Sequence, residues 1–381
     1  MYLFFCFLSL GLFWIQSLFL AFGEMDSNFR RVLLVINILF LLGFSLSVYV
    51  KGRVLPFLAK AIVCFLVFEV VYSFANIEML TSYLPTIFLV FLSFFIAFDI
   101  GIKGFSEQWL GVLSASLLVV YIPQYFIFNG SRVVGEANLH QYSNNFGYLF
   151  LLLVPIFLFF KNRIVQLAFM LVSSGFCIMC FKRGAILILA GVVGIYLYSV
   201  LKSRVKHKWI FIGGMLLPIS CVVGAYLMEN AEVIFYRFQT ISEGSGRAEM
   251  YSLIFNGAFE SPLSFLIGHG FFTTYDLFYE KLGIALMAHS DYFQVLYDGG
   301  ILGCFMYGLL MIGGIKILKD VKSTVPEYYW VTFILIFVWF SKALISGVMV
   351  DKPCAIIFLG LGYVSGVVAQ KRLSMLMMKI K

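Results

Sequence analysis

Apolar runs about as long as a membrane is thick recur along the whole chain, and they constrain its fold more than any other feature. A helix needs roughly 20 consecutive apolar residues to cross the hydrocarbon core of a bilayer. Of the 381 residues, 62% are hydrophobic and only 12% are charged, against roughly a quarter charged in an ordinary soluble domain. Because so little polar surface is available, the composition excludes a soluble enzyme, a disordered chain and a disulfide-rich secreted domain.

Windows of that length predict an all-α polytopic membrane helix bundle with about twelve transmembrane helices. The predicted spans cover residues 2–22, 32–50, 57–75, 83–102, 109–128, 145–160, 164–181, 184–201, 209–228, 301–318, 328–349 and 354–370. Two divisions fall at the charged clusters Lys161-Asn162-Arg163 and Lys182-Arg183-Gly184, since a charge cluster at mid-depth in a bilayer is costly. The first run lacks a basic leader, so we expect a retained span and not a cleaved signal peptide.

The distribution of basic residues predicts that the N-terminus lies inside. Membrane proteins concentrate Lys and Arg in short cytoplasmic loops. With this orientation and twelve spans, most of the 27 basic residues fall on the inner side of the membrane. The same bias explains the net charge of +8 without a nucleic-acid partner.

One long connection divides the chain into three regions of a single functional unit. Residues 1–228 are predicted to form a transmembrane bundle of about nine spans, residues 229–290 an extracytoplasmic loop, and residues 291–381 a short rim helix and the last three spans. A loop this long in a compact protein is usually functional. It contains short helices in our prediction, because polar and apolar residues separate onto two faces between Arg247 and Glu260 with a helical period.

Two residues of this loop have side chains that could bind an anion or transfer a proton. Arg247 stands where the predicted helix begins, and free N–H groups at such a position favour an anion. An arginine whose stem packs on lipid would show the same pattern. His289 stands just before the short rim helix, where an imidazole could act as a base near pH 7. A surface or capping histidine is the ordinary alternative.

These residues also fall into a pattern known from one enzyme family. The segment from Gly246-Arg247 to Gly303 resembles the characteristic region of the O-antigen polymerase (Wzy-type) and O-antigen ligase superfamily of bacterial membrane glycosyltransferases. The pattern runs from an arginine after a Ser/Gly turn, through a Pro-containing stretch that ends in Gly268-His269-Gly270, to His289-Ser290 followed by Gly300 and Gly303. A second element of the family, Ser/Lys-Arg-Gly at an outer junction between spans, resembles residues 181–184.

The resemblance implies glycosyl transfer from a polyprenyl-pyrophosphate-linked glycan. The active site would face the periplasm, at the outer face of the bacterial inner (cytoplasmic) membrane. Pyrophosphate leaves readily once its charge is stabilised, and arginines supply this by bidentate contact with phosphate oxygens. The acceptor hydroxyl must lose a proton as it attacks, which suits a neutral histidine. We therefore expect His289 and Arg247 to be the catalytic residues.

Further candidates for binding the pyrophosphate or the glycan are basic residues predicted at the outer face. They are Arg183 and Lys182 at the outer junction, Arg237 in the long loop, Arg132 and His140 in the connection 129–144, and Lys342 near the outer end of a span. For Lys342 the ordinary alternative is a side chain that snorkels to the membrane surface. No Asp-x-Asp motif occurs in the sequence, so we expect neither a metal nor another cofactor.

Three functions fit these features. We predict a polymerase, which joins a glycan on its undecaprenyl-pyrophosphate carrier to the next lipid-linked repeat unit of O-antigen or a related surface polysaccharide. A chain-length regulator would be its protein partner. The alternative enzyme is a ligase that delivers the same donor to lipid A core. The alternative from another class is a flippase or transporter of lipid-linked saccharide, for which Glu69 or Lys342 would be indispensable and His289 would not.

Overall fold

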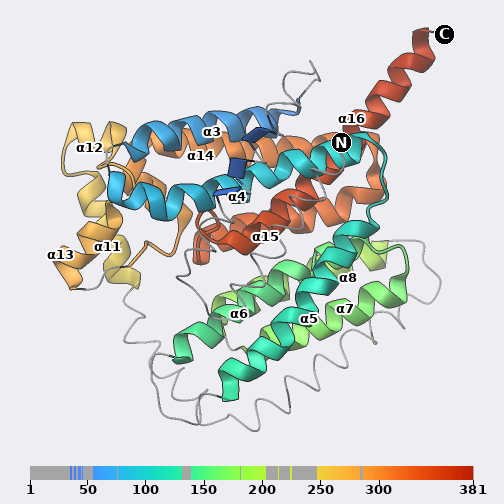
Figure 1. Cartoon of the computed structure of the whole chain (residues 1–381), viewed down its shortest axis with the longest axis horizontal. Coiled ribbons are helices and arrows are strands. Elements are labelled where there is room, and N and C mark those ends of the chain that lie inside the picture. Colours follow the sequence, from blue (N-terminus) through green and yellow to red (C-terminus); the bar gives the residue numbers. More distant parts are fainter. Residues whose placement is uncertain are drawn as a thin grey trace.

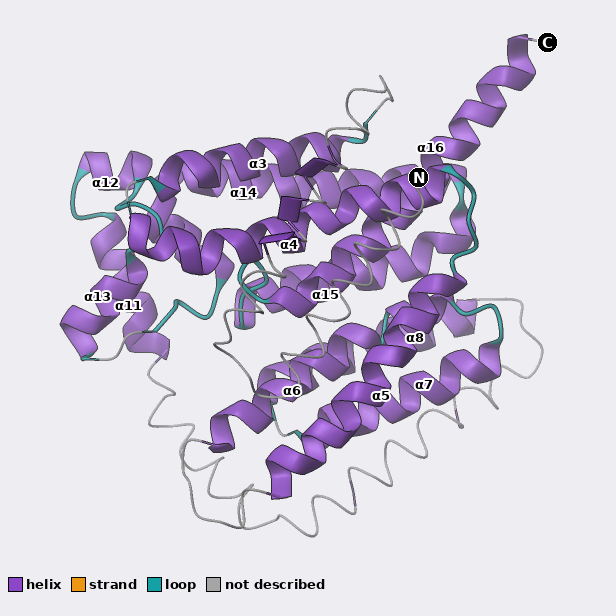
Figure 2. Cartoon of the chain, viewed as in Figure 1, coloured by secondary structure: helices purple, strands orange, loops and turns teal. Residues whose placement is uncertain are grey.

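The fold was analysed in a computed structural model of the chain. The structure describes residues 55–74, 76–130, 139–180, 182–202, 247–283 and 286–380, with isolated positions between 35 and 45 and at 213 and 224. Every regular element within these ranges is a helix (Figure 2). The predicted all-α class is therefore confirmed for the described part of the chain.

Six helices in the described ranges are long and apolar enough to cross a membrane. They cover Tyr83–Ile102, Gln108–Ile127, Arg183–Lys202, Asp291–Thr324, Pro326–Ile345 and Lys352–Met378. Shorter apolar helices cover Asn145–Phe159 and Arg163–Met179. These helices confirm a polytopic membrane bundle. The count of twelve stays a prediction, because the predicted spans 2–22, 32–50 and 209–228 lie wholly or largely outside the described residues.

The helices form two groups and a cap at one end (Figure 1). The first group contains α3 (Phe57–Ser73), α4 (Ile77–Ile102), α14 (Asp291–Thr324), α15 (Tyr329–Ile345) and α16 (Ala355–Ile380). The second contains α5 (Gln108–Gly130), α6 (Leu139–Leu153), α7 (Arg163–Met179) and α8 (Arg183–Lys202), with the 3₁₀ turn η2 (Ile156–Phe159) after α6. The cap contains α11 (Arg247–Ala258), α12 (Pro262–Ile267) and α13 (Thr274–Leu282). Since α15 packs against both α14 and α8, it joins the two groups.

Glycines allow α4 and α16 to pack with their backbones in contact. A Cβ added at Gly362 or Gly366 of α16 would lie 2.1 Å from the carbonyl oxygen of Phe94 or Phe98 of α4. Small residues at helix interfaces permit this close approach in membranes, where packing contributes much of the association energy. The contact fixes the centre of the first group, against which the helices of the site are arranged.

The helix α14 combines the predicted rim helix with the following span. It runs from Asp291 to Thr324, but Gly300 has a non-helical conformation with φ of 57°. The rim helix and the span are therefore joined through a kink at Gly300. The predicted spans 328–349 and 354–370 correspond to α15 and α16, although α15 ends at Ile345. It ends early because the chain turns at Gly347, which has φ of 82°.

Candidate functional site

The cap helix α11 packs on the rim segment of α14 through the apolar face that the sequence predicts. Met250, Ile254 and Ala258 are buried, and their spacing of four places them on one face. The Tyr251 ring stacks on the Phe293 ring with centroids 4.2 Å apart. The described part of the long loop is thus fixed against the helix that follows His289.

The two glycine elements of the sequence pattern lie in contact with each other. Backbone N–H groups of His269 and Gly270 donate to the carbonyl oxygens of Tyr297 (3.0 Å) and Asp298 (2.9 Å). A Cβ added at Gly300 would lie 2.6 Å from the Gly268 nitrogen, and both glycines have positive φ, a conformation that other residues adopt only with strain. The motif spacing therefore has a structural cause: two chain segments meet where no side chain fits.

His269 belongs to this packing. Its ring stacks on Tyr297 with centroids 4.3 Å apart, and Nε2 lies 3.0 Å from the carbonyl oxygen of Gly257. These contacts hold the end of α11 to α14. We therefore assign His269 a structural role.

Arg247 is the first residue of α11, as the sequence predicts. Its half-buried guanidinium donates from Nη1 to the carbonyl oxygen of Ile345 at 3.0 Å. That carbonyl belongs to the last turn of α15, where carbonyls lack helical partners. Arg247 thus points into the protein and not along lipid. An arginine carries five N–H donors, so one such bond leaves donors for an anion.

His289 lies directly before α14 in a strained conformation. Its φ is 52°, a left-handed geometry that costs a residue with a side chain roughly 1–2 kcal/mol. Such strain is concentrated at functional sites in proteins. Hydrogen bonds on both sides of His289 hold the loop in place. The Ala288 N–H donates to Gln294 Oε1 at 3.1 Å, and the Asp291 carboxylate accepts from the Val348 N–H.

The pKa of His289 is lowered from 6.5. Burial is the largest cause, because it disfavours the charged imidazolium, and the positive charges of Arg247 and Lys182 contribute in the same direction. The imidazole is therefore neutral at pH 7 and able to accept a proton. The charges that act on His289 thus come from two other segments of the chain, the start of α11 and the junction before α8.

The junction between α7 and α8, which the sequence predicts at the outer face, packs against α6 and α15. A Cβ added at Gly184 would lie 2.3 Å from the Tyr148 Oη and 2.6 Å from Ile345 Cγ2, so only glycine fits this position without a shift. Lys182 Nζ lies 5.9 Å from the centroid of the Tyr148 ring. Arg183 is exposed where α8 begins. The junction therefore packs on Ile345, the residue whose carbonyl accepts the hydrogen bond from Arg247.

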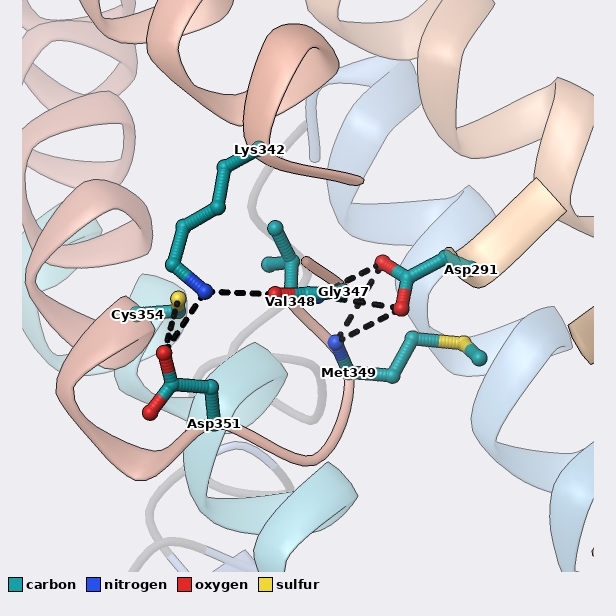
Figure 3. Close-up of polar contacts among 7 residues, drawn as sticks. All are labelled: Asp291, Lys342, Gly347, Val348, Met349, Asp351 and Cys354. Carbon is teal, nitrogen blue, oxygen red and sulfur yellow. Dashed lines mark hydrogen bonds and ion pairs between the residues drawn. The ribbon is translucent and has the colours of Figure 1, made fainter. Parts of the chain in front are cut away.

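Lys342 is buried, so the snorkelling explanation does not apply. Its Nζ forms an ion pair with Asp351 Oδ2 at 2.6 Å and donates to the Gly347 carbonyl at 2.5 Å, as Figure 3 shows. The same ammonium lies 4.9 Å from the centroid of the Tyr148 ring. Lys342 thus stabilises the turn after α15 beside the site, and a role in binding substrate stays a prediction.

Two buried aspartates were missed as organising residues by the sequence analysis. The Asp291 carboxylate accepts hydrogen bonds from the Val348 N–H at 2.9 Å and from the Tyr307 hydroxyl at 2.9 Å; Figure 3 shows how Asp291 faces the turn after α15. It therefore ties the rim segment to the turn after α15. In the sequence Asp291 stands only where a helix begins, a position that favours a carboxylate, and nothing there points to the contact with residue 348.

Asp298 performs the same task for the cap. Its carboxylate accepts from the backbone N–H groups of Phe272 (3.1 Å) and Thr274 (3.1 Å) and from the Thr273 hydroxyl (3.2 Å). The side chain amide of Gln294 also donates to it. No sequence signal other than its place before Gly299-Gly300 indicated this role.

Glu69 lies beside this network and not against lipid. It is buried in α3 and lines, with Gln294 and Asp298, a cavity of about 20 Å³. That volume holds about one water molecule. The arrangement favours the structural interpretation of Glu69 over a transport site.

Three predicted binding residues cannot be placed in this site. Arg132 and Arg237 lie outside the described residues, and so does the side chain of His140. Within the described ranges, no group of three or more His, Cys, Asp and Glu side chains could hold a metal ion.

Fold and site together define a polytopic membrane protein with a histidine of lowered pKa and an inward-pointing arginine at one end of its bundle. Residues 167–308 match the family model described as O-antigen ligase, which confirms the resemblance to the O-antigen polymerase and ligase superfamily. The matched segment includes Lys182, Arg247 and His289. No curated protein matches the chain. The match supports a function of the ligase or polymerase type, which is glycosyltransferase-like.

Proposed function

We propose that this protein is an O-antigen or related surface polysaccharide polymerase that works without a metal. The observation that supports the proposal is that Arg247 and the 182–184 junction both contact Ile345 at the end of α15. The pKa of His289 is lowered by burial and by the charges of Arg247 and Lys182. The donor would be a glycan on undecaprenyl pyrophosphate, and the acceptor the next lipid-linked repeat unit. A chain-length regulator is the protein partner that this function implies.

The reaction requires one proton acceptor and an anion site. The acceptor hydroxyl attacks the anomeric carbon of the donor, a new glycosidic bond forms, and the bond from that carbon to the pyrophosphate oxygen breaks. His289 takes the hydroxyl proton, which general base catalysis requires of a neutral group. The guanidinium of Arg247 and the ammonium of Lys182 stabilise the negative charge on the leaving pyrophosphate. Arg183, exposed at the same junction, binds a phosphate of the donor pyrophosphate or the glycan attached to it.

The site would face the periplasm from the bacterial inner membrane. Basic residues such as Lys103, Lys161 and Lys202 follow or precede helices at the opposite end of the bundle from His289. The bias of Lys and Arg towards the cytoplasm supports this orientation. A donor tail would then lie in the bilayer with its pyrophosphate at the outer surface, level with the cap.

A ligase that transfers the same donor to lipid A core is the second candidate, and the description of the matched family model favours it. The first experiment is a gel of surface glycan from the native bacterium with the gene deleted and restored. A ladder that collapses to a single repeat unit on the core supports the polymerase. Loss of surface glycan with accumulation of lipid-linked polymer supports the ligase.

The catalytic roles are tested by His289→Gly and Arg247→Ala. Glycine adopts the φ of 52° that His289 has without strain, so the first variant should fold at least as stably as the native protein. Loss of a general base lowers rate by about 10²–10⁴-fold, and loss of an electrostatic group by about 10²–10³-fold. Lys281→Ala on exposed α13 is the matched control and should keep native activity. Near-native polymer from either variant would remove that residue from the site.

A transporter makes a different prediction. It requires Glu69 or Lys342 and tolerates loss of His289. In that case Glu69→Gln would block glycan export at native protein level, while His289→Gly would leave the glycan unchanged.

A further inference from the structure

A second cavity lies at the end of the bundle opposite the cap. It has a volume of about 520 Å³ and is lined by residues of η2, α7, α8, the 3₁₀ turn η3 (Pro326–Tyr328), α15 and the loop before α5. This volume falls within the range of about 300–1,000 Å³ of small-molecule sites. None of the residues discussed at the Arg247 and His289 site contributes to it.

The distance between the two ends separates this cavity from the reaction. Helix α8 begins at Arg183 beside the proposed active site and ends at Lys202 near the cavity. Its 20 residues extend about 30 Å at 1.5 Å per residue. An occupant of the cavity therefore does not reach His289. The distribution of basic residues places the cavity on the cytoplasmic side.

The cavity carries charges of both signs. Arg163 is exposed at the start of α7, and no ion pair within the described ranges joins it to a carboxylate. Glu107 and Glu327 line the same cavity. The Tyr363 hydroxyl donates to the Phe105 carbonyl at 2.7 Å and lies 3.4 Å from Glu107 Oε2, so the Glu107 carboxylate keeps acceptor capacity for a ligand. A ligand with one positive and one negative group would find a partner for each.

Aromatic side chains line the rest of the wall. Tyr196, Tyr328 and Trp330 face the cavity, and the Tyr198 ring packs on Trp330 with centroids 5.6 Å apart. Tyr and Trp are enriched where the hydrocarbon core meets the headgroups, so the cavity lies at headgroup depth. Aromatic faces also attract ammonium groups.

We propose that this cavity binds the headgroup of a zwitterionic amine phospholipid from the inner leaflet. Arg163 contacts the phosphate, Glu107 and Glu327 contact the ammonium, and the acyl chains extend into the bilayer. An anionic phospholipid fits less well, because it would bring its charge to two carboxylates without a compensating ammonium. The proposal concerns the cytoplasmic end and stands apart from the reaction at the cap.

The test is native mass spectrometry of the purified full chain in detergent. The protein is titrated with phosphatidylethanolamine and, separately, with phosphatidylglycerol of identical acyl chains. We expect about threefold to fivefold tighter binding of phosphatidylethanolamine, as one exposed ionic contact contributes up to about 1 kcal/mol. Equal binding of the two lipids, or preference for phosphatidylglycerol, would overturn the proposal.

Lipid binding by single variants tests which side chain contacts which group of the lipid. Arg163→Gln should weaken both lipids, whereas Glu107→Gln and Glu327→Gln should each reduce the preference for phosphatidylethanolamine. Glu327 is exposed, so its variant is informative even where Glu107→Gln alters folding. Lys161→Gln, at an exposed position outside the cavity lining, is the control and should bind both lipids as the native chain does.

A final arm distinguishes a membrane lipid from a soluble compound. Glycerophosphoethanolamine has the same headgroup without acyl chains. We expect it to bind at least tenfold more weakly than phosphatidylethanolamine, because it buries no hydrocarbon. Equal binding of the soluble compound, or unchanged lipid binding by Arg163→Gln, would contradict the proposal.

Discussion

Replacement of Gly184 by alanine tests how tightly the outer junction is built into the site. The added Cβ would lie 2.3 Å from the Tyr148 Oη and 2.6 Å from Ile345 Cγ2, well inside van der Waals contact. Tyr148 is only 3% exposed, so its ring has little room to move away. Overpacking of this kind costs about 1–3 kcal/mol. We therefore expect Gly184→Ala to lower the free energy of unfolding by that amount.

The same substitution should also reduce activity. Ile345 supplies the carbonyl that holds Arg247 at 3.0 Å, and a forced shift of α15 would move that guanidinium. A displacement of about 1 Å in a catalytic group can cost about 10²-fold in rate. Thermal unfolding of the purified protein should show a fall in Tm of a few degrees, and a polymerisation assay with lipid-linked repeat units should show the loss of rate.

Two variants control this experiment. Gly194→Ala lies in the same helix with nothing within 4 Å of the added Cβ, so it should be neutral or stabilise by up to about 1 kcal/mol through helix propensity. Adding Tyr148→Phe to Gly184→Ala removes the atom in closest contact and should restore part of the stability. Equal Tm values for Gly184→Ala and Gly194→Ala would refute the reasoning.

Three further predictions follow from the charged residues near the site. Burial and the charges of Arg247 and Lys182 lower the pKa of His289, so activity measured from pH 5 to 8 should rise with pH below 6.5. Lys182→Gln should move this rise to higher pH. A rise above pH 6.5 in the native enzyme would contradict the prediction. Lys342→Met should lower the free energy of unfolding by about 1–3 kcal/mol. The loss is smaller than for a fully buried ion pair because the Asp351 side chain is 33% exposed. Adding Asp351→Asn should recover most of the lost stability. Asp298→Ala removes the acceptor of two backbone N–H groups and should cost about 2 kcal/mol or more; an unchanged Tm would show that the cap does not depend on this carboxylate.

The candidate site could be predicted at the positions that short sequence motifs mark. Motifs indicated the positions of Arg247, His289 and the Lys182-Arg183-Gly184 junction, and in the structure Arg247 and Gly184 both contact Ile345. The glycines at 268 and 300 could be recognised as a pattern, but the reason for the pattern could not. Their backbones meet across the fold, and that contact has no local signal in either segment.

The buried acidic residues show the limit of sequence reasoning. Asp291 lies in the first turn of its own helix, yet its carboxylate accepts a hydrogen bond from the N–H of Val348, far along the chain. Asp298 was not singled out, although it accepts several hydrogen bonds from the loop at 272–274. Which donor a buried carboxylate finds depends on how the helices pack.

By itself, the sequence determined that this protein is an α-helical membrane bundle with a specialised loop. That was possible because the length and hydrophobicity of a span are local properties, and every backbone polar group of a lipid-exposed span must be satisfied within it. Only the tertiary structure decided that Lys342 pairs with Asp351 in the interior and does not snorkel. A buried and a snorkelling Lys342 are both compatible with the same stretch of sequence. Lys342 is buried because the turn after α15 folds back and brings Asp351 to its ammonium.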